Sequence, residues 1–238
     1  MKIYYDFHLH SCLSPCGDND MTPQNICNMM KLMGFNAFAL TDHNTCKNCP
    51  ACKEIADGLG LTFIPGMELT TSEEVHVVCL FYSLEDALSF SDYVYGTLPP
   101  VKNKPNIFGE QFCLNSNDEL VETEEKLLIT ASTVSAMNVA EIVAKYNGIC
   151  FPAHIDRSSF SILSNLGSFD ESFGFNLAEI YDMSKEKELR ENLPYLNSLK
   201  ILSSSDAHYL ENIRLPGEML EVEECSVDGI FASLRCQQ

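Results

Sequence analysis

The chain has 238 residues, and 45% of them are hydrophobic, which is enough to bury a sizeable core in one α/β barrel or two small domains. Its net charge is −19, and a surface this acidic argues against a protein that binds duplex nucleic acid. No run of about 18 uncharged apolar residues occurs, so we expect no membrane-spanning helix. The stretch from Met1 to Asp6 meets an acidic residue too early for a secretory leader.

Eleven cysteines without an export signal predict a cytoplasmic protein with free thiols. Cys46, Cys49 and Cys52 form the one cluster with metal-like spacing. Three thiols rarely complete a tetrahedral site, and no fourth ligand is nearby. Since the three positions also drift along one face of a helix, we favour core packing over a metal site.

Short strands alternate with helices along most of the chain. Strands are expected at Ile3–His8, Ala37–Thr41, Leu61–Met67, Val75–Phe81, Gly148–Pro152 and Lys200–Ser204. Helices are expected at Pro23–Met33, Cys49–Gly58 and Val139–Lys145, with Gly34 ending the first and Asn44 capping the second. This alternation predicts βαβ units and a parallel sheet.

A polar, turn-rich segment from about residue 94 to residue 130 interrupts this pattern. It contains Pro99-Pro100, Pro105 and the acidic stretch 119–125. The segment is either a lid over the site or a solvated excursion, and the excursion is favoured because charged runs usually face solvent. With no internal repeat in the sequence, we expect residues 1–238 to form a single domain that carries this insert.

All six histidines lie in a few short pieces of sequence, most of them at the ends of expected strands. The pieces are Asp6–Ser11, Thr41–Asn44, Val75–Val77, Pro152–His154 and Ser205–His208. Imidazole is the commonest side-chain ligand of zinc, iron and manganese, and carboxylates complete such sites. The carboxyl ends of parallel strands meet on one face of a barrel, so these pieces and Glu68 should meet there. His76 lies within its strand and would have to point inward. The sequence therefore predicts a metalloenzyme.

Six motifs in a fixed order resemble the PHP family (polymerase and histidinol phosphatase domains). They are His-x-His-Ser, Thr-Asp-His-Asn, Pro-Gly-Met-Glu, a histidine in a strand, Pro-Ala-His and Ser-Asp-Ala-His, and they span His8 to His208. The resemblance implies a distorted (β/α)7 barrel, similar to a TIM barrel, and a metal-dependent phosphoesterase with a trinuclear site.

The same resemblance implies a ligand set for each metal. The first metal would bind His8, His10, Glu68 and Asp206; the second Glu68 as a bridge, His76 and His154; the third His43, His208 and a carboxylate from the loop after His10. Counting back from Pro23 puts Asp18 at the loop position, with Asp20 and Cys16 as alternatives. Asp6 and Asp42 are expected to orient histidines rather than to bind metal.

These residues predict a hydrolase acting on phosphoric ester bonds, with two to three divalent transition metals (zinc, manganese or iron) as cofactors. Glu68 and Asp206 would hold cations that supply hydroxide at neutral pH. Arg157 is a candidate phosphate-binding residue, with a surface ion pair as the alternative, and Arg214 is a weaker candidate.

The expected substrate is a small phosphomonoester or nucleotide, with neither duplex nucleic acid nor a membrane as partner; the sequence leaves the oligomeric state open. Two alternatives remain. One is an exonuclease acting on short single-stranded oligonucleotides, and the other is a non-catalytic metal-binding PHP domain within an assembly.

Overall fold

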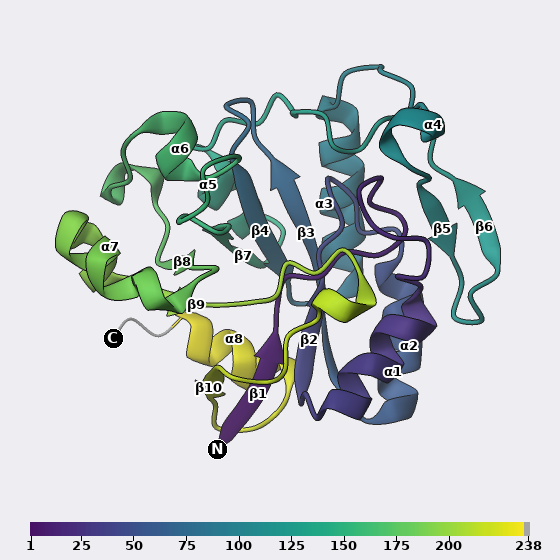
Figure 1. Ribbon diagram of the computed structural model, residues 1–238, viewed down its shortest axis with the longest axis horizontal. Helices are drawn as coiled ribbons and strands as arrows, with labels where there is room; N and C mark the ends of the chain where they lie inside the picture. Colours follow the sequence, from purple (N-terminus) through teal and green to yellow (C-terminus); the bar gives the residue numbers. More distant parts are fainter. Residues whose placement is uncertain (236–238) are drawn as a thin grey trace.

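A curled six-stranded sheet, in the order β10-β1-β2-β3-β4-β7, forms the centre of the computed structural model, which describes residues 1–235 (Figure 1). The strands are β1 (Lys2–Asp6), β2 (Ala37–Leu40), β3 (Thr62–Thr70), β4 (His76–Phe81), β5 (Phe112–Leu114), β6 (Leu120–Thr123), β7 (Gly148–Pro152), β8 (Leu177–Glu179), β9 (Lys200–Leu202) and β10 (Met219–Glu221). The α-helices are α1 (Pro23–Met33), α2 (Cys49–Leu59), α3 (Leu84–Thr97), α4 (Pro105–Phe108), α5 (Val139–Ala144), α6 (Ile162–Leu166), α7 (Glu186–Asn192) and α8 (Val227–Arg235), and short 3-10 helices lie at Glu171–Phe173, Met183–Lys185, Pro194–Ser198 and Leu210–Asn212.

Within the six-stranded sheet, the expected parallel pairing is present for β1, β2 and β3 only. β1 pairs in parallel with β2, and β2 with β3, whereas β4 runs antiparallel to both β3 and β7. The chain passes from β3 to β4 through the short turn at residues 71–75, and a parallel crossover needs a dozen or more residues, about the length of a helix. The prediction of an all-parallel sheet is therefore wrong at β4.

The sheet curls so that its far edge approaches β1 again. β8 and β9 pair with each other in parallel, and the backbone N–H of Ile155, just after β7, donates to the carbonyl of Glu179 in β8 at 2.9 Å. On the other side, the N–H of Asp206, after β9, donates to the carbonyl of His8 at 2.9 Å. The fold is thus a mixed α/β half-barrel, while the exact (β/α)7 arrangement stays a prediction.

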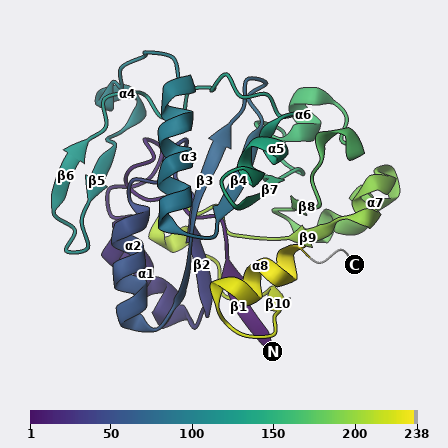
Figure 2. The ribbon, with the colours of Figure 1, turned by 180° about the vertical axis from the view of Figure 1, so that it is seen from behind.

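The two faces of the sheet bury different sets of apolar side chains. Phe38 belongs to a core cluster that includes side chains of α1, α2 and α3, whereas its neighbour Ala39 belongs to a second cluster with Phe231 of α8. Alternation along a strand sends successive side chains to opposite faces. Seen from behind, α3 lies across β3 and α8 across β1 (Figure 2). Each fully buried phenylalanine contributes roughly 1.5–3 kcal/mol.

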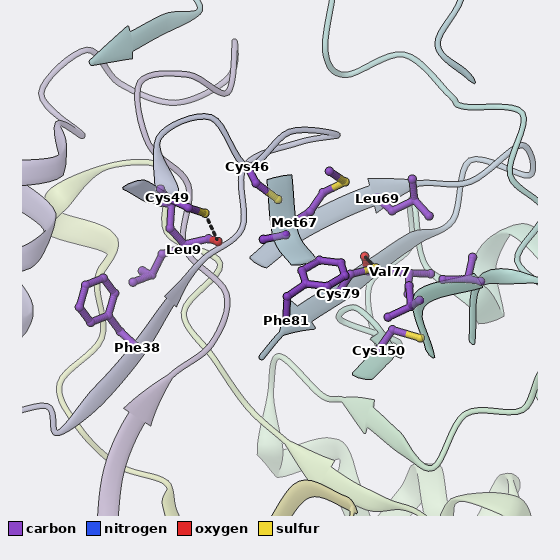
Figure 3. Packing of buried hydrophobic residues seen from close by; sticks show 14 of the residues in the cluster. Leu9, Phe38, Cys46, Cys49, Met67, Leu69, Val77, Cys79, Phe81 and Cys150 are labelled. Carbon is purple, nitrogen blue, oxygen red and sulfur yellow. Dashed lines mark hydrogen bonds between the residues drawn. The ribbon is translucent and has the colours of Figure 1, made fainter. Parts of the chain in front are cut away.

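The cluster of Cys46, Cys49 and Cys52 lies in the hydrophobic core, as the packing interpretation predicts. Cys46 and Cys49 sit beside Met67 and Leu9 (Figure 3). The Cys46 thiol donates to the carbonyl of Gly66 at 3.1 Å. Burial, and next the hydrogen bond with Cys49, raise the pKa of Cys46 well above its ordinary value. A thiol held in its neutral form is a poor metal ligand.

The segment 94–130 is only in part the solvated excursion that its composition predicts. α3 runs to Thr97, and the segment then forms α4 and the hairpin β5-β6, at the outer edge of the molecule (Figure 1). β6 is exposed along its whole length, but the β5 residues Cys113 and Leu114 are buried. Whether the segment is an insertion stays a prediction.

Asn44 does not cap α2, so that prediction is wrong. The N-cap of α2 is Asn48. Asn44 has a left-handed backbone (φ 54°), and its side chain accepts a hydrogen bond from the N–H of Thr70 at 2.9 Å and donates to the carbonyl of Leu128 at 2.7 Å. Its amide therefore joins β3 to the segment that returns from the hairpin. Among residues 1–235, no helix has both the length and the apolar character needed to cross a membrane.

Candidate metal centre

The reversal of β4 brings the expected ligands to one edge of the sheet. His8, His43 and Glu68 lie at or near the carboxyl ends of the parallel strands β1, β2 and β3. Because β4 is antiparallel to β3, its first residue, His76, lies at this same edge and pairs with Thr70. β7 is antiparallel to β4 in turn, so it ends here just before His154. His76 thus reaches the centre from the start of a strand.

Glu68 lies in the middle of the histidines and is 1% exposed. Its Oε1 atom is 3.1 Å from His8 Nε2, 3.0 Å from His76 Nδ1 and 3.3 Å from His154 Nε2. Its Oε2 atom is 3.3 Å from His10 Nε2 and 3.0 Å from His43 Nδ1. The two oxygens face different imidazole groups, which is the arrangement that a carboxylate bridging two cations requires.

Asp206 joins His8, His10 and Glu68 in a group of four buried residues whose ligand atoms lie within 4.8 Å of one another. Its Oδ1 atom is 3.4 Å from His8 Nε2 and 3.3 Å from His10 Nε2. This is the set expected for the first metal. Two further groups with the same spacing are His43, Glu68 and His76, and His10, His43 and His208.

In the loop after His10, neither Asp18 nor Asp20 belongs to a group of potential metal ligands within residues 1–235. The Oδ1 atom of Asp18 accepts a hydrogen bond from the N–H of Asp20 at 2.8 Å, and Asp20 itself is exposed. Cys16 lies in the same loop and is exposed. Desolvation alone would raise the pKa of Cys16, but the nearby imidazoles of His43 and His208 lower it to about 5. The role of Asp18 as a ligand stays a prediction.

Several buried polar atoms at this centre have no hydrogen-bond partner within residues 1–235. They are His8 Nε2, His10 Nε2, His43 Nδ1 and both carboxylate oxygens of Glu68. An orphaned buried polar atom costs about 1–3 kcal/mol, more when it is charged, and native proteins rarely keep several in one place. Imidazole nitrogens and carboxylate oxygens are the donors that zinc, iron and manganese bind. The residues present therefore fit divalent cations.

The charges in this cluster depend strongly on one another. Burial alone would raise the pKa of Glu68, but His76, His8 and His43 outweigh it and hold that pKa well below its usual range. Burial likewise opposes protonation of His8, yet Glu179, Glu68 and Asp206 raise its pKa well above the ordinary value. Burial lowers the pKa of His76 to about 4. Burial would raise the pKa of Asp206 too, but His8 and His10 outweigh it and lower that pKa. The carboxylates of Glu68 and Asp206 therefore both stay anionic at neutral pH.

Sequence reasoning missed Glu179, which holds His8 in place. The Oε2 atom of Glu179 is 2.9 Å from His8 Nδ1 and accepts a hydrogen bond from the N–H of His154 at 3.0 Å. A carboxylate on the far nitrogen of a ligating imidazole fixes the ring's orientation. The sequence does contain one signal for this role, because Glu179 lies inside the apolar run from Leu177 to Ile180. A carboxylate buried in such a run requires charged or polar partners.

Asp42 and Asp6 take part in orientation, as expected, but through other groups than the imidazoles. Asp42 accepts the hydroxyls of Ser11 and Ser14, both at 2.7 Å, and the Ser14 oxygen lies 3.0 Å from His10 Nδ1. Asp6 accepts from the backbone N–H of His8 at 3.2 Å. Each aspartate therefore places a ligand through a neighbouring hydroxyl or amide.

Two expected ligands hold a left-handed backbone. His154 has φ 30° and Asp206 has φ 50°. Such conformations cost of order 1–3 kcal/mol for residues other than glycine and gather at functional sites. Here they turn the chain sharply after β7 and β9, so that both side chains face Glu68.

Arg157 makes an ion pair at the rim of the centre. Its Nη1 atom is 2.6 Å from Asp206 Oδ2, and its guanidinium lies 4.0 Å from the centroid of the Tyr181 ring. Arg214 lies 3.8 Å from the centroid of the same ring. The ion pair that the sequence left as an alternative is thus present, with a member of the candidate metal cluster as its partner, and phosphate binding by Arg157 stays a prediction.

A curated relative acts on RNA. The chain is 35% identical over 83 residues to the 5'-3' exoribonuclease Rnm of Salmonella typhimurium, and 36% identical over the same length to that of Escherichia coli. Each match covers 33% of this chain and 27% of the relative, so the similar region is a minor part of those proteins.

Two solved structures share the fold across nearly the whole chain. The lesion-specific endonuclease PfuEndoQ of Pyrococcus furiosus matches with a TM-score of 0.72 and 20% identity, covering 99% of this chain and 56% of the other. Endonuclease Q in complex with a 27-mer duplex carrying an abasic lesion at the active site matches with a TM-score of 0.66, 20% identity and coverage of 97% and 55%. The chain thus spans about half the length of these endonucleases.

These relatives contradict the expectation of a small phosphorylated substrate with no duplex nucleic acid as partner. One is an exoribonuclease, and a protein of the same fold holds duplex DNA at its active site. The net charge of −19 misled because it sums over the whole surface, whereas a substrate meets the local field of the site. The relatives are hydrolases of phosphoester bonds, which confirms the expected enzyme class at the level of the family.

The resemblance read from the six motifs is confirmed by comparison with protein families. The PHP domain model matches residues 6–211, a span that contains every expected ligand from His8 to His208. The motif order, the half-barrel and the clustered imidazoles and carboxylates agree with that match. This chain belongs to the PHP domain family.

Proposed function

We propose that this protein is a metal-dependent exonuclease that cleaves terminal phosphodiester bonds of short single-stranded nucleic acids at a trinuclear site. The observation that carries the proposal is the position of Glu68. Its two oxygens face separate sets of imidazole nitrogens, at 3.0–3.3 Å, in a buried cluster whose polar atoms lack hydrogen bonds within residues 1–235. A site of this kind has several cation positions around one shared carboxylate.

The proposed ligand sets are those that the family resemblance implies, and the first of them is also one of the three groups at the centre. One cation is held by His8, His10, Glu68 and Asp206, and a second by Glu68, His76 and His154. A third is held by His43, His208 and a ligand from the loop after His10. Cations bound there would lower the pKa of water towards 7 and neutralise phosphoryl oxygens. Donor sets of nitrogen and oxygen accept zinc, iron or manganese according to supply.

The rim of the centre supports a nucleic-acid strand as the substrate. Arg157 is placed to donate to a phosphoryl oxygen beside Asp206, since a guanidinium matches phosphate with two parallel hydrogen bonds. The guanidinium groups of Arg157 and Arg214 both lie over the ring of Tyr181. Aromatic rings and guanidinium planes are the surfaces on which unpaired bases stack. A cavity of about 540 Å³ borders both residues and the segment before Asp206.

The length of strand that the site would bind depends on its local field. Attraction for phosphate is concentrated at the proposed metals, at Arg157 and at Arg214. A few nucleotides near the cleaved bond would gain from that positive field, and nucleotides beyond its reach would gain little.

The test is hydrolysis of a ladder of end-labelled oligonucleotides by the manganese-loaded protein. Catalytic efficiency should rise from a mononucleotide over the first few nucleotides and then level off, with products released one at a time from one end. Arg157→Ala should raise KM several-fold with metal content unchanged, and Arg190→Ala on α7 serves as the matched control.

Three other outcomes would redirect the proposal. Equal catalytic efficiency on oligonucleotides of every length would show that the protein does not bind a strand beyond the cleaved bond. Internal cleavage of a duplex would indicate an endonuclease instead of an exonuclease. Metal uptake without hydrolysis of any rung would favour a non-catalytic metal-binding domain.

A further inference from the structure

Phe160 is an exposed aromatic residue at the rim of the centre, and its backbone is left-handed. Its φ is 53°, and the residue is 44% exposed. For a bulky side chain this conformation is a genuine outlier, and such strain persists only where the surrounding contacts impose it. An aromatic ring normally stabilises a fold by being buried, but much of this ring stays in water. Packing alone therefore does not account for Phe160 at this position.

The backbone around Phe160 is tied to the start of β4 and to its own loop. The N–H of His76 donates to the carbonyl of Phe160 at 2.9 Å. The next residue, Ser161, caps α6, and its hydroxyl donates to the carbonyl of Arg157 at 2.7 Å. These bonds give the loop after β7 a defined path and hold Phe160 at the rim.

The ring of Phe160 stacks on a proposed metal ligand. Its centroid is 4.7 Å from that of the His76 imidazole, and the two ring planes meet at 17°. His76 Nδ1 in turn lies 3.0 Å from Glu68 Oε1. Because the imidazole covers one face of Phe160, its exposed surface lies mainly on the opposite face and the edge. An open aromatic face is thus separated from the bridging carboxylate by a single ring.

Phe160 shares its short loop with the arginine of the rim. Arg157 Nη1 is 2.6 Å from Asp206 Oδ2, in the ligand set of the first proposed metal, whereas Phe160 stacks on His76, in the set of the second. A guanidinium binds phosphate, and an open aromatic face stacks on a base. One loop thus places a group suited to each part of a nucleotide beside two of the proposed cations.

We propose that the open face of Phe160 is a stacking platform for one base of the bound strand, at a nucleotide next to the cleaved bond. This inference rests on the exonuclease function proposed above, and it makes Phe160 a residue that selects nucleic acid over phosphate esters without a base. Every base has a π-face, so the contact should not favour a particular sequence. Loss of one such stack should weaken binding by about 5- to 150-fold.

The first test compares two strands on the zinc-loaded full chain by titration calorimetry. One is a short adenosine oligonucleotide with phosphorothioate linkages, which resist hydrolysis, and the other is the same backbone with abasic sugars. Phe160→Ala should weaken binding of the first strand by the factor given above and leave affinity for the abasic strand unchanged. A residue that merely supports His76 would affect both strands alike. Elemental analysis and far-ultraviolet circular dichroism check that the variant keeps its zinc and its fold.

The second test observes the stack directly and does not depend on the alanine variant. The chain contains no tryptophan, so Phe160→Trp introduces a single fluorescent reporter. Its emission should be quenched by the adenosine strand and not by the abasic one. The control is Tyr82→Trp, just past the opposite end of β4 and similarly exposed (41%), and its emission should respond to neither strand.

The results separate failure of this inference from failure of the proposed function. An equal loss of affinity for both strands in Phe160→Ala, or equal quenching by both in Phe160→Trp, would reduce Phe160 to a support for His76 and leave the exonuclease standing. Failure of the zinc-loaded wild type to bind either strand would remove the nucleic-acid substrate, and both proposals with it.

Discussion

Glu68 is the residue on which the centre depends most. Its carboxylate is 1% exposed and contacts five imidazoles, three through one oxygen and two through the other. Removing one partner from such a buried network leaves several charged groups uncompensated, which is more damaging than losing an exposed ion pair. Substitutions here therefore test the bridging role directly.

We predict that Glu68→Gln weakens two metal sites together. The neutral amide has one oxygen to offer and cannot supply an anionic oxygen to each of two cations. Loss of a partner outside the ligand sphere already costs 10–100-fold, so activity should fall by more than about 100-fold. Elemental analysis alongside turnover measures both effects, and Glu74→Gln, in the exposed turn between β3 and β4, is the control. Retention of full metal content by Glu68→Gln would exclude the bridge.

A second prediction concerns Glu179, which orients His8 and ties it to β8. In Glu179→Gln the carboxamide still accepts the N–H of His154 but no longer presents an anion to His8 Nδ1. Affinity for the first metal should fall about 10–100-fold, with a smaller effect on stability. Competition with a chromophoric chelator measures this affinity, and Glu188→Gln on the exposed face of α7 is the matched control. Unchanged affinity would reduce Glu179 to a packing role.

At the scale of elements, the β5-β6 hairpin is attached to the centre through one buried side chain. Asn48, at the start of α2, donates to the Ser11 hydroxyl at 2.9 Å and to the carbonyl of Phe112 at 3.1 Å. Its Oδ1 atom accepts the N–H of Leu114 at 2.9 Å. One amide thus links the loop after β1, the helix α2 and the hairpin.

We predict that Asn48→Ala destabilises the protein by about 2–4 kcal/mol, because it leaves buried backbone groups of β5 without partners. The hairpin should also become the first region cut in limited proteolysis, since it would be held by fewer bonds. Urea unfolding measures the change in the free energy of unfolding, and mass spectrometry of the early fragments identifies the first region cut. Asn28→Ala on the exposed face of α1 is the control. A loss of stability no larger than the control's would refute the linking role.

The elements that sequence predicted well are those with a strong local signal. α1 begins and ends at the predicted residues, with Thr22 accepting at its start and Gly34 in the left-handed conformation at its end. β8 and β10 were missed because three residues carry no measurable period. The pairing of β10 with β1 joins Ile3 to Leu220, and no local pattern encodes a contact over that distance.

The candidate site was predictable in its composition but less so in its geometry. Residue types and their order gave His8, Glu68 and Asp206, because few other arrangements explain histidines beside carboxylates. Counting back from Pro23 gives only a position in the sequence, whereas the path of the loop after His10 also depends on Gly17 packing against the backbone and on a bond to His208. Such contacts are set by tertiary structure rather than by spacing.

At the scale of the whole molecule, the charges buried at the centre link metal binding to pH and to stability. The protein has a net charge of −19 and buries several carboxylates near one another, including Glu68, Asp206 and Glu179. Without cations the histidines offset part of that charge by taking up protons, as the raised pKa values of His8 and His43 indicate. Metal binding must displace those protons, so metal affinity should fall as the pH decreases.

The last prediction is that metal ions raise the thermal stability of the whole molecule. A ligand that binds only the folded state adds about 2.7 kcal/mol when its concentration is 100 times its dissociation constant. For a chain of about this length, each kcal/mol shifts Tm by roughly 2–4 °C. One saturated site should therefore raise Tm by about 5–11 °C, and further sites should add to this shift.

Calorimetry of chelator-treated protein before and after zinc or manganese is added measures that shift. Sodium chloride at matched ionic strength should produce little of it, because monovalent ions screen the surface without entering the cluster. Glu68→Gln should lose most of the shift, since two sites share that carboxylate. An unchanged Tm after saturating zinc and manganese would mean that the buried atoms around Glu68 are satisfied by protons alone, and the metal-dependent function would fall with it.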